Sequence, residues 1–115
     1  MFIHYQVFLH IIDNAIDAIR DNPYCSNKPE IRVITEVVDR EWVRIVIANT
    51  DSVIPKSLLK RIFDPFFTTK PIGSGTGLGL FVSHSIIQKH GGTLSVHSKP
   101  REGTNFKILL PLNYA

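Results

Sequence analysis

Four glycines at alternate positions stand directly before a helical apolar pattern, in the segment GSGTGLGL at residues 73–80. Backbone N–H groups without side chains around them form a concave anion site, and a helix that follows adds the positive end of its dipole. The segment lacks the Gly-Lys-Ser/Thr ending of a P-loop and the GxGxxG spacing of a dinucleotide fold. Taken alone, it is equally typical of a phosphate cradle and of a flexible loop before a helix.

A polar stripe interrupts the apolar surface of the first expected helix. His10, Asn14 and Asp17 follow one another at intervals of four and three residues, which places them on one helix face. An amide or carboxylate oxygen on this face suits Mg²⁺, which prefers oxygen ligands and binds together with substrate phosphates. A solvated helix face is the other interpretation. It accounts well for the bordering Asp13, and for Asn14 both interpretations stay open.

The segment FDPFFTTK, residues 63–70, places three phenylalanines in an expected loop, where polar residues are usual. We expect the three rings to anchor this loop to the core. Thr68, Thr69 and Lys70 would then face phosphate groups, although a solitary lysine is more often a surface charge.

Hydrophobic periodicity predicts the elements that must position these segments. In chain order they are a helix at 2–21, strands at 30–38 and 41–49, a short helix at 57–63, a loop at 64–77, a helix at 78–90, and strands at 93–98 and 104–110. In the first helix we expect one apolar stripe, widened by a second: Val7, Ile11, Ala15 and Ala18, then Phe8, Ile12, Ile16 and Ile19. Because helices and strands do not alternate, the order predicts an α+β sandwich of two layers. Its sheet would be mixed, mostly antiparallel, with the helices on one face.

The composition fits one globular domain. The chain has 115 residues, of which 43% are hydrophobic and 20% charged, so it can bury a core. The net charge of +3 comes from scattered cations and gives no ground for a nucleic-acid partner. A single cysteine, Cys25, forms no internal disulfide and favours a reducing, cytoplasmic compartment. The apolar start is too short to span a bilayer, so we expect no membrane contact by this chain.

Four segments, taken in order, resemble the sequence boxes of the catalytic ATP-binding domain of sensor histidine kinases. They are HIIDNAIDAI, RIFDPFFTTK, GSGTGLGLFVSHSIIQKHGG and REGTNFKILLPL, which resemble the N box, the F box, the G2 box and the final Gly-Thr strand. The resemblance covers nearly the whole chain, and the combination of FDPFFTTK with GTGLGL is highly specific. The wider superfamily includes type II topoisomerase, Hsp90 and mismatch-repair ATPases, and the FFTTK element favours the kinases within it.

The resemblance implies a Bergerat-type fold that holds ATP between its helices, under a lid at about residues 68–76. Asn14 would be the ligand of a Mg²⁺ that bridges the phosphates, Lys70 would assist catalysis, and Thr104 would lie near the adenine. The full set of nucleotide-binding residues that the resemblance implies is Asn14, Asp17, Asn49, Ile54, Phe67, Gly75, Thr76, Gly77, Leu78, Gly79 and Thr104.

The resemblance also implies a function. Residues 1–115 would be the catalytic domain of a longer kinase in two-component signal transduction, without the strand that precedes the first helix in the family. The domain would donate the γ-phosphoryl group of ATP to a histidine on a separate dimerisation domain, and a response regulator would act downstream. Phosphoryl transfer is mostly positioning and charge neutralisation. No segment resembles the phosphoacceptor box, so we expect no autophosphorylation by the isolated domain.

The chain departs from the family pattern at NTDSVIP, residues 49–55, where the family has Asp-x-Gly-x-Gly. Asn49 stands in place of the Asp that accepts a hydrogen bond from the adenine amino group. An amide oxygen still accepts that bond, but without charge. Val53 replaces a glycine, and His10 replaces the Asn or acidic residue that opens the N box.

These departures motivate an alternative from another class of protein, a degenerate nucleotide-sensing or scaffold domain without turnover. A conformational ATPase of the topoisomerase or Hsp90 kind is a third interpretation. It would require a carboxylate base near His10 to activate water.

Overall fold

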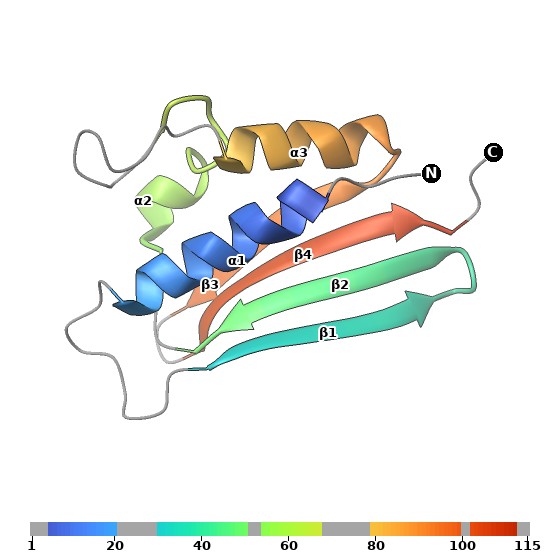
Figure 1. Cartoon of the computed structure of the whole chain (residues 1–115), viewed down its shortest axis with the longest axis horizontal. Coiled ribbons are helices and arrows are strands. Elements are labelled where there is room, and N and C mark those ends of the chain that lie inside the picture. The colour runs from blue at the N-terminus through green and yellow to red at the C-terminus, as the bar shows by residue number, and fades with distance from the viewer. Residues whose placement is uncertain (1–4, 21–29, 51–53, 68–78, 100–101, 113–115) are drawn as a thin grey trace.

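A computed structural model describes residues 5–20, 30–50, 54–67, 79–99 and 102–112 (Figure 1). The elements are α1 (Tyr5–Arg20), β1 (Ile31–Val38), β2 (Trp42–Asn49), α2 (Lys56–Leu59), α3 (Gly79–Lys89), β3 (Thr93–Lys99) and β4 (Gly103–Pro111). Their order is the one that hydrophobic periodicity predicts. No helix in these residues is both long and apolar enough to cross a membrane.

The four strands form one sheet in the order β1-β2-β4-β3, and every pairing between them is antiparallel. The two hairpins that the sequence predicts are both present. Pairing of β2 with β4 joins them, so strands that lie far apart in the chain form the centre of the sheet. In this register Asn49, the last residue of β2, lies opposite Thr104 near the start of β4.

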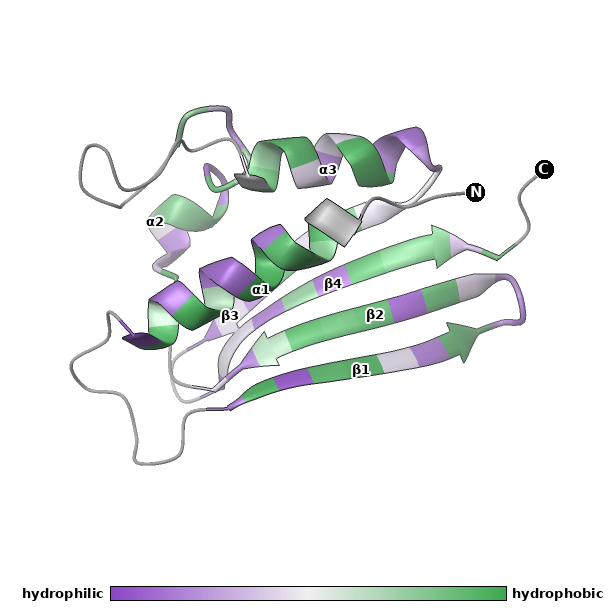
Figure 2. Cartoon of the chain, in the orientation of Figure 1, coloured by the Kyte–Doolittle hydropathy of each residue, from purple (hydrophilic) through white to green (hydrophobic). Residues whose placement is uncertain are grey.

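Helices α1 and α3 lie side by side on one face of the sheet, which confirms the predicted two-layer α+β fold (Figure 1). Strand β2, which α1 contacts, is hydrophobic along most of its length (Figure 2). Alternate residues of β4 point into the core, while Lys107 between them is exposed. The buried apolar cluster consists of Val7, Ile11, Ile47, Ile62, Ile87, Leu94, Phe106, Ile108 and Leu110.

The apolar stripe of α1 is narrower than the sequence suggests. Val7, Ile11 and Ala15 are buried as predicted. Ile16, which we expected to widen the stripe, is 44% exposed. At about 100° per residue it lies about 140° around the helix from Ile11, on the side turned away from the sheet. Phe8 and Ile12, which belong to the same predicted widening, do pack against the core, so Ile16 is the residue at which the prediction is wrong.

The segment after β2 also differs from expectation. The short helix predicted at 57–63 is confined to Lys56–Leu59, and successive turns follow it up to Phe67. The backbone N–H groups of Arg61, Asp64 and Phe67 each donate to the carbonyl three residues earlier, so tight turns replace the expected helical hydrogen bonds.

The three phenylalanines of this segment do not all anchor it. Phe63 and Phe67 pack against the core, whereas Phe66 is 71% exposed. Phe66 has a φ of 66°, a left-handed conformation within the turns. The expectation that all three rings are anchored is therefore wrong for Phe66.

Candidate nucleotide site

Three polar side chains form a row across the sheet where its inner face ends. Asn49, Thr104 and Ser98 lie on β2, β4 and β3 and are only 3%, 2% and 8% exposed. Asn49 pairs with Thr104, and Thr104 pairs with Ser98, so all three project from the same face. This is the face that carries the apolar core. Burying polar groups costs free energy unless they are hydrogen-bonded. A polar row at the end of an apolar face is therefore a candidate for a recognition site.

Hydrogen bonds tie the row to the segment that follows β2. The hydroxyl oxygens of Ser98 and Thr104 lie 2.8 Å apart. The backbone N–H of Ile54 donates to the hydroxyl oxygen of Ser98, also at 2.8 Å. In the part of the chain that the structure describes, no buried side-chain nitrogen or oxygen lacks a partner. Asn49, Thr104 and Ile54, three residues that the resemblance assigns to nucleotide binding, are thus brought to one end of the sheet.

Sequence reasoning missed Ser98, the residue that connects Thr104 with Ile54. One signal for it exists in the strand pattern. Leu94, Val96 and Ser98 are alternate residues that share the inner face of β3, so a polar residue there interrupts an apolar series.

Glycine at position 103 allows β4 to begin close to the end of β2. Gly103 has a φ of 81°, and a Cβ added there would lie 2.0 Å from the backbone carbonyl oxygen of Asn49. No real side chain fits in this space. The close approach fixes the position of the next residue, Thr104, relative to Asn49.

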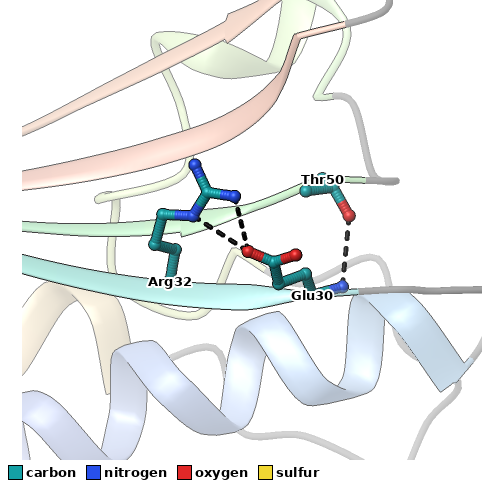
Figure 3. Close-up of polar contacts among 3 residues, drawn as sticks. All are labelled: Glu30, Arg32 and Thr50. Atoms are coloured by element: carbon teal, nitrogen blue, oxygen red, sulfur yellow. Dashed lines mark hydrogen bonds and ion pairs between the residues drawn. The ribbon is translucent and has the colours of Figure 1, made fainter.

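At the same end of the sheet, hydrogen bonds join the residue before the edge strand β1 to the residue after β2 (Figure 3). The backbone N–H of Glu30 donates to the Thr50 hydroxyl at 3.2 Å, and the Thr50 N–H donates to the Glu30 carbonyl at 3.2 Å. Arg32 donates to the Glu30 carboxylate from two nitrogens, at 2.9 and 2.6 Å. The charged groups are exposed, so the ion pair adds little stability. The backbone bonds hold the chain where it leaves Asn49.

The polar stripe of α1 lies near the start of α3. His10, Asn14 and Asp17 are all half-buried, while Asp13 is exposed, as the solvated-face interpretation predicts for it. Nδ1 of His10 lies 3.4 Å from the buried Ser83 hydroxyl. A Cβ added at Gly79 would lie 3.5 Å from the His10 ring, which is ordinary contact. The stripe therefore begins against the first turns of α3, where the glycine run ends.

The remaining predicted residues fall into two groups. Asp17 pairs with Arg20 one turn along α1, and Ile54 and Phe67 are half-buried against the core. The Arg61 guanidinium lies 4.9 Å from the centre of the Phe67 ring. The expected lid at 68–76 and five of the predicted site residues lie outside the described residues: Lys70, Gly75, Thr76, Gly77 and Leu78.

The half-buried amide of Asn14 is suited to Mg²⁺. Mg²⁺ prefers oxygen ligands and is commonly bound by one or two protein groups together with substrate phosphates. Within the described ranges, no three His, Cys, Asp or Glu side chains gather as a metal site.

Comparison with known proteins identifies the family. Residues 3–114 match the family model described as histidine kinase-, DNA gyrase B- and HSP90-like ATPase. The chain is 44% identical over 108 residues to the signal transduction histidine-protein kinase AtoS of Escherichia coli, covering 94% of this chain and 16% of that protein. It is 41% identical over 109 residues to the two-component sensor PprA of Pseudomonas aeruginosa, covering 93% of this chain and 12% of that protein.

A solved structure has the same fold. The catalytic domain of the histidine kinase ThkA superposes with a TM-score of 0.74 at 33% identity, over 92% of this chain and 65% of that chain. The chain thus spans only a small part of its curated relatives and about two thirds of this solved domain. The match over nearly all of its residues is nevertheless decisive: the chain belongs to the family of histidine kinase-, DNA gyrase B- and HSP90-like ATPases.

Proposed function

We propose that residues 1–115 act as the catalytic ATP-binding domain of a histidine kinase. The domain binds Mg-ATP and presents the γ-phosphoryl group to a histidine on a separate dimerisation domain, and a response regulator acts downstream. The observation that carries this proposal is the buried row of Asn49, Thr104 and Ser98 in a chain of an ATPase family. Relatives such as AtoS and PprA, which are named as a histidine kinase and a two-component sensor, support the kinase assignment.

Asn49 suits adenine by its chemistry. A side-chain amide presents an acceptor and a donor together, and Asn forms paired hydrogen bonds with adenine in protein–DNA complexes for this reason. A carboxylate at the same place would only accept. Asn49 therefore keeps the acceptor for the adenine amino group and adds a donor for a ring nitrogen. Thr104, directly opposite it, lines the same end of the sheet.

The phosphates lie in this proposal at the start of α3. This helix is 11 residues long, and the N–H groups of its first turn point toward an anion placed there. Gly79 begins this turn, the glycines before it would add further backbone N–H groups, and Lys70 would add a positive charge. Asn14 would hold Mg²⁺ through its amide oxygen, and the metal supplies charge neutralisation for the phosphates.

The chain's own residues thus bind and orient the nucleotide and perform no covalent step. Positioning and electrostatic stabilisation account for most of phosphoryl-transfer catalysis, so a site of this kind is sufficient on the donor side. The nucleophile is the histidine of the partner domain.

Transfer of labelled phosphate tests the proposal. The chain is incubated with γ-labelled Mg-ATP and the dimerisation domain of a relative such as AtoS. We expect acid-labile, base-stable label on that domain's histidine, no label on the chain alone, and no label with Asn14→Ala. Steady ATP hydrolysis without an acceptor would instead indicate a conformational ATPase, and neither transfer nor hydrolysis would indicate a scaffold.

A further inference from the structure

Ser98 links the two strands of the β3–β4 hairpin to a segment that is distant in the chain. It lies near the end of β3, its hydroxyl is 2.8 Å from that of Thr104 on β4, and it accepts the N–H of Ile54, which lies 44 residues earlier. The residue is 8% exposed, so water does not readily replace either partner. Both partners are residues that the proposed function places at the adenine end of the site.

The chemistry of the hydroxyl makes this junction specific. A serine hydroxyl offers one donor and two acceptor positions. The Ile54 N–H only donates, so Ser98 must accept there, and its remaining capacity is directed to Thr104. One oxygen atom therefore fixes the backbone at Ile54 and the side-chain orientation of Thr104 together.

Asn49 and Ile54 stand on either side of residues 50–53, and both are held by the β3–β4 hairpin. At one end of this segment, Asn49 is held by its pairing with Thr104. At the other end, Ile54 is held by Ser98. Two residues of the motif that departs from the family pattern, Asn49 and Ile54, are thus each tied to this hairpin.

We propose that Ser98 is a positioning residue for the adenine end of the nucleotide site. It acts through Thr104 and Ile54 and makes no contact with the ligand itself. This inference rests on the proposed function and adds to it a residue that the family resemblance did not assign.

Substitution of Ser98 by alanine tests the inference, with Ser95→Ala as its matched control. Ser95 lies on the same strand but is exposed. Calorimetry measures the affinity of each variant for a non-hydrolysable Mg-ATP analogue and for Mg-tripolyphosphate, which lacks the base and ribose. We expect Ser98→Ala to lower the affinity for the ATP analogue about tenfold, which is the effect of losing one hydrogen bond to a buried group. Tripolyphosphate affinity should remain within about twofold, and Ser95→Ala should change neither.

A double-mutant cycle separates positioning from simple loss of stability. If Ser98 acts through Thr104, the double variant Ser98→Ala with Thr104→Val should lose less ATP binding free energy than the sum of the losses in the two single variants. Ser98→Cys, which keeps a weak donor and acceptor, should fall between serine and alanine and serves as the main variant if Ser98→Ala does not fold.

Several outcomes overturn the inference. They are an unchanged ATP affinity in Ser98→Ala, an equal loss of affinity for ATP and for tripolyphosphate, and additive losses of ATP binding free energy in the double-mutant cycle. If the unsubstituted chain binds tripolyphosphate and ATP equally weakly, the proposed function fails, and the positioning role fails with it. If the wild-type chain prefers ATP to tripolyphosphate and the Ser98→Ala variant binds both with the same affinities as the wild type, the positioning role alone is refuted.

Discussion

Two asparagines occupy opposite environments in this domain. Asn49 is 3% exposed at the end of the central strand β2, in a row with Thr104 and Ser98. Asn14 is half-buried on α1, beside the exposed Asp13. The fold surrounds the first amide, so its hydrogen bonds serve stability as well as recognition. The second amide lies at the boundary with solvent, so a substitution there can remove ligand binding with little effect on stability.

This contrast extends to the two ends of the proposed nucleotide site. The adenine end is built on paired strands and buried side chains. The phosphate end is built on helix starts, with Gly79 at the beginning of α3 against His10 on α1. Substitutions at the first end should therefore cost stability, and substitutions at the second should cost binding alone.

Gly103→Ala should have the largest effect on stability, because it acts on the close approach that supports Asn49. The added Cβ would lie 2.0 Å from a backbone oxygen, at a φ of 81°. We expect a loss of about 3 kcal/mol in the free energy of unfolding, measured in urea, from strain and overpacking together.

Gly91→Ala is the matched control for this substitution. Gly91 has a similar φ of 77°, but the nearest atom to an added Cβ is 3.7 Å away. It should lose only about 1 kcal/mol, the cost of the backbone conformation. Equal losses in the two variants would show that the approach to β2 is not the constraint.

Asn49→Leu should have an intermediate effect on stability and a large one on binding. The change keeps much of the side-chain volume and removes the amide from the polar row. We expect about 2 kcal/mol of lost unfolding free energy, because polar groups at that end lose a partner. Binding of the ATP analogue should become undetectable in the same calorimeter. Unchanged ATP affinity would place the adenine elsewhere.

Asn14→Ala should have the smallest effect on stability and should still impair the site. We expect the unfolding free energy to stay within about 0.5 kcal/mol of the wild type, as for other substitutions near solvent. The increase in ATP affinity on adding Mg²⁺ should disappear, while affinity without Mg²⁺ should hardly change. Asp13→Ala, on the exposed side of the same helix, is the control. A Mg²⁺ dependence that survives in Asn14→Ala would exclude this amide as the metal ligand.

Local patterns predicted most of the architecture. The strand predicted at 30–38 is Ile31–Val38, and both hairpins and the core residues Val7 and Ile11 are as expected. Pairing of β2 with β4 was not predicted, because register between distant strands depends on packing that no local window contains. Ile16 and Phe66 were assigned to the core because apolar character does not show which side of an element the sheet covers.

The candidate site was predictable only where a motif marked it. Thr104 belongs to a segment that resembles a family box, Asn49 stands where the chain departs from the family pattern, and the structure places the two opposite each other. The alternation of Leu94, Val96 and Ser98 places Ser98 on the inner face of β3, but only the structure shows its partners, Ile54 and Thr104. Lys70 and the glycines at 73–77 lie outside the described residues, and their phosphate roles stay predictions.

Calorimetric titration of the unsubstituted chain with a non-hydrolysable ATP analogue, with and without Mg²⁺, tests the central claim most directly. The account predicts one saturable site per chain, a clear preference for ATP over GTP, and tighter binding when Mg²⁺ is present. No binding heat at millimolar nucleotide, with or without the metal, would contradict the account and favour a scaffold domain that has kept the fold but lost the ligand.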